Sequence, residues 1–156
     1  MGQIYDVVKA FLEEDDWPLI ELAQLPAIKT GFEGQAARWD CYARPLDDDN
    51  QLLFYSLCPF TVPREKRPAV MEYTTRVNYG LRMGNFELNL DDGEVRFKTS
   101  LDCEGGELTS ALVKQLIYAN VLLMDQYLPG LLGIMYGDLG AREAIQQVEG
   151  LPTARA

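Results

Sequence analysis

Apolar and polar residues alternate along residues 78–102, and this alternation predicts a β-hairpin. Near its middle lie Asp92 and Gly93, which suit a two-residue type I′ turn because both turn positions need a positive φ. A turn at these two residues fixes which residues of the two arms face each other.

That turn places Leu88 opposite Phe97 on an apolar face of the hairpin. On the other face it places Glu87 opposite Lys98, a cross-strand pair of opposite charge. A slip of one residue would turn every apolar side chain to the wrong face, so we expect this register.

Three further strands are predicted before the hairpin, over about 26–33, 36–44 and 51–58. Residues 33–35 form the turn between the first two strands, and the acidic stretch 47–50 connects the second to the third. Apolar residues alternate along the second strand, at Trp39, Cys41 and Ala43.

The helical pattern, with apolar residues three and four positions apart, occurs at residues 3–14, from Pro68 to about Tyr79, and over 107–128. Pro129 is expected to end the long helix, and a short helix is predicted at 140–148. The chain therefore reads as an α+β fold with a single five-stranded antiparallel sheet, in the order α-β-β-β-α-β-β-α, plus a short C-terminal helix.

The helix over 107–128 carries two apolar rows where one would suffice to cover a sheet. Leaving three such side chains in water would forgo roughly 5–9 kcal/mol of burial. We therefore expect a homodimer, with the second row of this helix as one candidate interface. That row consists of Val113, Ile117, Met124 and Leu128.

Composition limits the classes of function. A net charge of −10 repels phosphate groups, so nucleic acid and anionic membranes are not expected partners. No run of about 18 apolar residues predicts a membrane span, and the start of the chain lacks the pattern of a secretory signal. We expect a cytoplasmic protein with one domain over 1–150 and a frayed tail over 151–156.

Catalytic chemistry has few candidates in this sequence. The chain has no histidine, which removes His-based acid–base catalysis and His-activated nucleophiles. Its three cysteines are too widely spaced for a metal site, and residues 47–50 lack the ligand spacing of an EF-hand loop. Phosphate-binding glycine motifs are also missing, so we expect no enzyme activity, no cofactor, no metal and no catalytic residue.

Several short motifs together resemble one known family. They are Tyr-Ser at 55–56, Asn-Tyr-Gly at 78–80, Gly-Asn-Phe-Glu-Leu at 84–88, Asp-Gly at 92–93 and Lys-Thr-Ser at 98–100. With this pattern the chain resembles the YbjN-domain family of bacterial proteins, whose members are described as sensory transduction regulators. The resemblance extends from Ile4 to about Glu149 and implies a fold like that of type III secretion chaperones.

Such chaperones are small acidic homodimers without enzymatic activity that bind an extended segment of another protein. The resemblance implies the same activity here, with a signalling or transcription regulator acting through a protein partner as the alternative. Related folds suggest that the dimer interface includes the 66–80 helix and the 85–90 strand. The candidate interface residues are Val70, Tyr73, Val77, Phe86 and Leu88.

For partner binding we expect an apolar surface on strands 36–44 and 51–58. The candidate residues are Trp39, Tyr42, Leu52 and Phe54. Each of them could instead be core, because alternation sends one residue of every neighbouring pair inward and the sequence does not say which. The acidic residues Asp40 and Asp47–Asp49 would border this surface and favour a basic partner.

Overall fold

The computed structural model describes residues 2–150, which form one antiparallel sheet with helices against it. The strands lie in the order β1-β2-β3-β4-β6-β5. The elements are α1 (Gln3–Glu14), β1 (Ile20–Glu21), β2 (Ile28–Glu33), β3 (Arg38–Leu46), η1 (Asp47–Asp49), β4 (Gln51–Thr61), η2 (Arg64–Lys66), α2 (Arg67–Gly80), β5 (Asn85–Leu88), β6 (Glu94–Asp102), α3 (Ser110–Gly137) and α4 (Ala141–Glu149).

The predicted α+β class is confirmed, with one correction to the sheet. It has six strands rather than five, because the two residues of β1 pair with Lys29 and Ile28 of β2. Both residues of β1 are exposed, so no apolar alternation marked this strand in the sequence. The predicted tail 151–156 lies outside the described residues.

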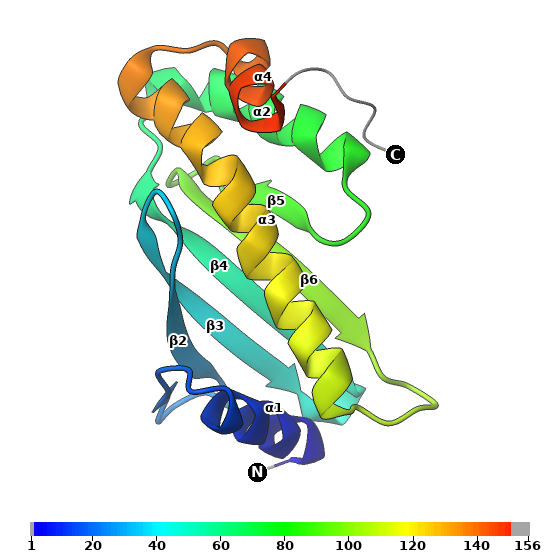
Figure 1. Ribbon diagram of the computed structural model, residues 1–156. Helices are drawn as coiled ribbons and strands as arrows, with labels where there is room; N and C mark the ends of the chain where they lie inside the picture. Colours follow the sequence, from blue (N-terminus) through cyan, green and yellow to red (C-terminus); the bar gives the residue numbers. More distant parts are fainter. Residues whose placement is uncertain (1, 151–156) are drawn as a thin grey trace.

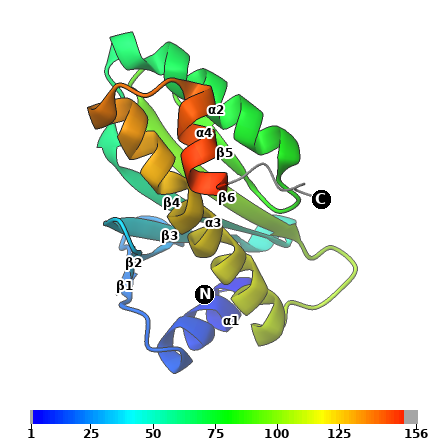
Figure 2. The ribbon, with the colours of Figure 1, turned by 45° about the horizontal axis from the view of Figure 1, so that its top comes forward.

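The helices pack on one face of the sheet. In Figure 1, α3 crosses the front of the sheet, α1 lies at one end, and α2 and α4 lie at the other. Figure 2 shows the same separation of α1 from α2 with the top of the molecule turned forward. Strand residues that face these helices alternate with residues that face away, so the sheet has one covered and one open face.

The long helix continues past the residue that was predicted to end it. Pro129 lies inside α3, which extends to Gly137, and Leu128, Leu131 and Ile134 on both sides of it are fully buried. The burial of these side chains outweighs the backbone hydrogen bond that proline cannot donate.

Gly130 lets α2 pack closely against α3 just beyond this proline. A Cβ atom at Gly130 would overlap the Tyr73 hydroxyl, which donates a 2.7 Å hydrogen bond to the Tyr127 carbonyl. Glycine is therefore required where the two helices cross.

The hairpin between β5 and β6 has a different register from the predicted one. Leu88 lies opposite Val95, and Glu87 opposite Arg96, a shift of two residues. Because the shift is even, each side chain stays on its predicted face. Leu90 is left out of the strand and is exposed.

Contacts outside the hairpin explain this longer turn. The Gly93 carbonyl accepts a 2.8 Å hydrogen bond from the Val62 N–H, and Arg67 donates to the carbonyls of Val62 and Leu90. The Asn89 side chain accepts from the Asp91 N–H, an Asx turn that begins the loop early. Asp92 keeps a negative φ, so the type I′ turn is not formed.

The outer edge of β5 is closed by a side chain. The Asn78 amide accepts a 2.8 Å hydrogen bond from the Phe86 N–H and donates one of 3.0 Å to the Phe86 carbonyl. An unpaired strand edge invites another strand to pair with it, and Asn78 occupies this part of the edge as such a strand would.

Candidate partner-binding surface

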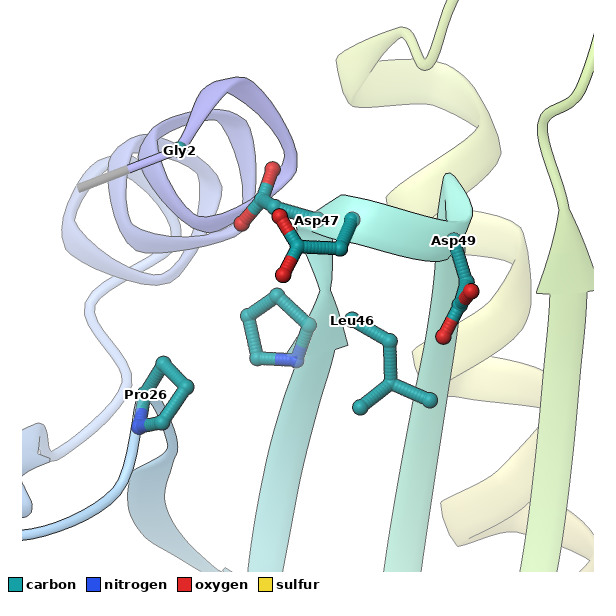
Figure 3. Close-up of a pocket in the computed structure, with 7 residues that line it drawn as sticks. Gly2, Pro26, Leu46, Asp47 and Asp49 are labelled. Carbon is teal, nitrogen blue, oxygen red and sulfur yellow. The ribbon is translucent and has the colours of Figure 1, made fainter.

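The acidic stretch at residues 47–49 serves the fold. The Asp47 carboxylate accepts hydrogen bonds from the N–H groups of Ile4 (2.7 Å) and Tyr5 (3.4 Å), so it caps the N-terminus of α1 from a distant loop. Figure 3 shows the shallow hollow at this place, with Asp47 beside the start of α1. A Cβ at Gly2 would overlap the Asp47 carboxylate, so this contact also needs a glycine.

Metal binding and thiol chemistry have no support in the described geometry. Within residues 2–150 no three His, Cys, Asp or Glu side chains are grouped so that they could hold a metal ion. Burial raises the pKa of the Cys41 thiol to about 12 and also raises those of Cys58 and Cys103. A thiol with a raised pKa is a poor nucleophile at neutral pH. In the same part of the chain, no helix is long and apolar enough for a membrane span.

Three of the four predicted partner-binding residues lie in the core. Trp39, Leu52 and Phe54 point toward the helices and are at most 2% exposed. The structure therefore contradicts a role for them as an exposed surface. Tyr42 points the other way and is half-buried on the open face of the sheet.

The predicted dimer-interface residues are also core residues. Val70, Tyr73, Val77 and Phe86 are buried between α2, β5 and α3, and only Leu88 is half-buried. The second row of the long helix, Val113, Ile117, Met124 and Leu128, is fully buried as well. The buried members of both sets therefore cannot form an interface with a second copy in this fold; Leu88 is the one member that is partly accessible.

What the structure offers instead is the open face of the sheet, the face that carries no helix. Its centre holds four half-buried apolar or aromatic side chains from β3 and β4. Tyr42 lies directly opposite Tyr55 across the two strands. Leu53 and Leu57 lie on either side of Tyr55 along β4. These four residues, Tyr42, Leu53, Tyr55 and Leu57, are called the apolar strip below.

Ion pairs hold the charged residues around the apolar strip. The Arg96 guanidinium lies 4.2 Å from the centre of the Tyr55 ring, within range of a cation–π contact. Glu87 accepts from both Arg96 (2.7 Å) and Lys98 (3.0 Å). Lys29 is 3.6 Å from Asp40, so the carboxylate that was expected to attract a basic partner is already paired.

Glu87 gives this face a pH-dependent contribution to stability. Burial raises the pKa of Glu87, but the hydrogen bonds from Lys98 and Arg96 outweigh it and hold the pKa below its ordinary value of 4.5. A lowered folded-state pKa stabilises the fold above the unfolded-state value, and that stability is lost as the pH falls through the lower folded-state value.

We expect Glu87→Gln to flatten the decrease of stability in acid. Between pH 7 and pH 3, the urea midpoint of the wild type should fall further than that of the variant, with the difference developing below the ordinary pKa of 4.5. Parallel curves for the two proteins over this range would show that Glu87 carries no stabilising charge interaction.

A second uncovered surface lies on the outward side of α2. Met71 and Tyr79 point away from the core at helical spacing, and Met83 follows in the loop to β5. Tyr79, part of the Asn-Tyr-Gly motif, is 96% exposed, and Met83 is 51% exposed. Met71, Tyr79 and Met83 are called the α2 stripe below.

The sequence contained part of the signal for the apolar strip. Asp40 and Arg44 each lie two residues from Tyr42 and so share its face of the strand, and charged residues usually mark the solvent-exposed face. Along β4 no charged residue separates the two faces, so Leu53, Tyr55 and Leu57 could not be assigned before the pairing of β3 with β4 was known.

Comparisons with known proteins concern the family and the fold of the chain. The model of the family described as "YbjN: Putative bacterial sensory transduction regulator" matches residues 5–133. No curated protein matches the chain in sequence.

Solved structures with similar folds include two at a TM-score of 0.59. One is described as "Crystal structure of YbjN, a putative transcription regulator from E. coli", with 12% identity, covering 78% of this chain and 85% of that one. The other is described as the ExsC–ExsE complex, with 13% identity over 83% of this chain and 98% of that one. At these identities they show a shared fold, the one predicted as type III secretion chaperone-like.

Proposed function

The chain belongs to the YbjN family, and on that premise we propose that it is a non-catalytic, cytoplasmic module that binds an extended segment of another protein. The observation that carries the proposal is the apolar strip, which none of the helices in residues 2–150 covers. Half-buried aromatic and aliphatic side chains in the middle of a sheet gain free energy when a partner covers them.

The fold supports this proposal in a second way. A chain with a similar fold has been solved in a complex, ExsC with ExsE. Protein-binding modules act through surfaces of this kind, whereas enzymes use enclosed pockets with convergent polar groups. The hollow at Asp47 and the grooves beside α3 are shallow and hold no such set of groups.

We expect the double substitution Leu53→Ser and Leu57→Ser to remove partner binding. Both side chains face away from the core, so the fold should be retained while the apolar contact is lost. Partner retained by affinity capture from the native cell, measured by quantitative mass spectrometry, should fall by about tenfold or more, as for loss of central interface residues.

The matched control is Leu25→Ser with Leu122→Ser. Both leucines are 56% exposed and lie away from the open face, in the β1–β2 loop and on α3. Capture of the same protein by the control at the wild-type level is the expected result. Undiminished capture by a folded Leu53→Ser/Leu57→Ser protein would exclude this face as the binding site.

We also propose that the protein forms a homodimer through the α2 stripe. Met71 and Tyr79 of α2 and Met83 of the loop after it are large, largely apolar side chains that this fold leaves exposed, and exposed apolar surface favours association. α2 lies next to β5, so the proposed interface stays in the region predicted from the sequence. The residues differ: the exposed side chains of the α2 stripe take the place of the buried ones predicted there.

Light scattering should give twice the monomer mass of 17.6 kDa for the wild type at tens of micromolar. The Tyr79→Ser/Met83→Ser variant should give the monomer mass, because both side chains leave the interface without disturbing the core. Tyr136→Ser, at a residue 72% exposed near the end of α3, should remain dimeric. A wild-type monomer at this concentration would contradict the proposal.

The alternative function, a signalling or transcription regulator that acts through a protein partner, is favoured by the family description. It uses the same surface, so the identity of the captured protein separates the two. An unfolded or newly made client supports the chaperone-like activity, and one folded regulatory protein supports the alternative.

A further inference from the structure

We propose that the open face of the sheet binds an acidic segment, an extended polypeptide whose carboxylates and apolar side chains share the side that faces the sheet. The inference rests on the proposed function, which places a partner on this face, and adds the chemistry of that partner. It reverses the expectation from the sequence, which favoured a basic partner.

The side chains around the apolar strip are mostly basic. Four basic and two acidic side chains point outward from the central part of the sheet, on a protein whose net charge is −10. They are Lys29, Arg44, Arg96, Lys98, Asp40 and Glu87. The local excess of positive charge is therefore opposite in sign to the charge of the whole molecule.

These bases are only partly neutralised within the fold. Arg96 and Lys98 share the single carboxylate of Glu87, and Lys29 is paired with Asp40. Arg44 is exposed, and among residues 2–150 no ion pair involves it. The face thus has cationic groups left to pair with carboxylates from outside.

The pairing of the strands sets these cations beside the apolar strip at regular intervals. Leu53 lies opposite Arg44 of β3, and Tyr55 lies opposite Lys98 of β6. Outward residues of one strand are about 6.5–7 Å apart, which is also the spacing of alternate side chains in an extended peptide. Every second side chain of a segment lying along β4 faces the sheet, and these side chains can place apolar groups on the strip and carboxylates beside the cations.

Acidic residues that lie off the open face do not cancel this local charge. At an ionic strength of about 0.15 M, charges more than about 8 Å apart are largely screened, so groups on the face itself decide the contact. At the ends of the strands the outward charged residues are Glu33, Arg38, Glu94 and Asp102, and Glu94 lies in one hollow with Arg96. With these four the face has five basic and five acidic residues, so the positive excess is confined to its centre. This mostly acidic border restricts an acidic segment to the centre of the face.

The test is selection from a phage-displayed library of random 15-residue peptides on the purified wild-type protein. We expect the selected peptides to be enriched in Asp and Glu that lie an even number of residues from apolar positions, so that both kinds of side chain can face the sheet. Synthetic versions of the selected peptides should bind about tenfold more weakly to Arg44→Glu/Lys98→Glu, by fluorescence anisotropy, and more weakly as salt is added.

Two further variants control this measurement. Arg64→Glu/Arg142→Glu makes the same change in net charge at two exposed sites off this face and should bind like the wild type. Arg44→Glu alone is used beside the double variant, because no ion pair within residues 2–150 involves Arg44 and its substitution should leave the fold intact. Equal weakening by the off-face control would mean that net charge alone matters and would overturn the proposal.

The outcomes also separate this inference from the proposed function. Selected peptides that need Leu53 and Leu57 but are neutral or basic would overturn the acidic partner and leave the binding function standing. Peptides that bind equally well to the Leu53→Ser/Leu57→Ser variant would remove the site and both proposals with it. Tighter binding of a 20-nucleotide single-stranded DNA to the same face would assign its charges to nucleic acid and overturn the inference.

Discussion

Replacing Gly93 by Ala should lower the free energy of unfolding by about 3 kcal/mol or more. Gly93 has a φ of +83°, where an ordinary residue costs roughly 1–2 kcal/mol. A Cβ there would also overlap the Val62 carbonyl, which is backbone and cannot swing aside, so the 2.8 Å bond from the Val62 N–H to Gly93 should be lost. Urea denaturation measures this loss as a lower midpoint.

Gly105→Ala is the matched control for this substitution. Gly105 has a similar φ of +78°, but apart from its chain neighbours no atom of residues 2–150 lies within 4 Å of the position of its Cβ. The free energy of unfolding of Gly105→Ala should therefore fall only by the cost of the positive φ, roughly 1–2 kcal/mol. Equal losses for the two variants would show that the contact between the hairpin turn and the end of β4 adds nothing to stability.

Replacing Asn120 by Leu should also have a large effect and lower the free energy of unfolding by about 3 kcal/mol. Asn120 is fully buried in α3, donates to the carbonyls of Phe54 and Phe97 and to the Thr99 hydroxyl, and accepts a 2.6 Å hydrogen bond from the Ser56 hydroxyl. It ties α3 to β4 and β6, as expected of a buried polar residue in an apolar helix. Losing a buried network of this size leaves polar groups without partners, each worth roughly 1–3 kcal/mol.

A double-mutant cycle with Ser56→Ala tests that interpretation. If the two side chains stabilise each other through the hydrogen bond, Ser56→Ala should cost about 1 kcal/mol in the wild type and clearly less beside Asn120→Leu. Purely additive losses in thermal or urea unfolding would show that the network has no energetic coupling at this bond.

The sequence predicted those parts of the fold that local pattern determines. The predicted bounds of the first helix, 3–14, are those of α1, because its apolar residues repeat at helical spacing. The predicted bounds of the three strands before the hairpin differ from those of β2, β3 and β4 by a few residues. Errors arose where distant contacts overrode local preference. The turn at Gly93 is drawn to Val62 and Arg67, and the core around Leu131 carries α3 through Pro129.

The binding surface was harder to predict than the fold. Apolar alternation says that one face of a strand is buried, but Leu52 and Leu53 are equally apolar, and only the packing of α3 decides that Leu52 points inward. Charge was equally ambiguous, since Asp47 reads as a solvent-exposed acid and instead caps α1. Tyr42 does lie on an outward position, but Trp39, whose side chain points to the opposite face, was proposed for the same surface, so the sequence had not separated the two faces of β3.

Site-specific photocrosslinking tests the central claim, that a partner protein lies on the open face of the sheet. A photoreactive phenylalanine analogue replaces Tyr55 in the apolar strip in one protein and Tyr136, exposed on α3, in another. After irradiation in the native cell, the account predicts a covalent complex with the captured partner from position 55 and none from position 136. A partner that crosslinks at 136 and not at 55 would contradict it.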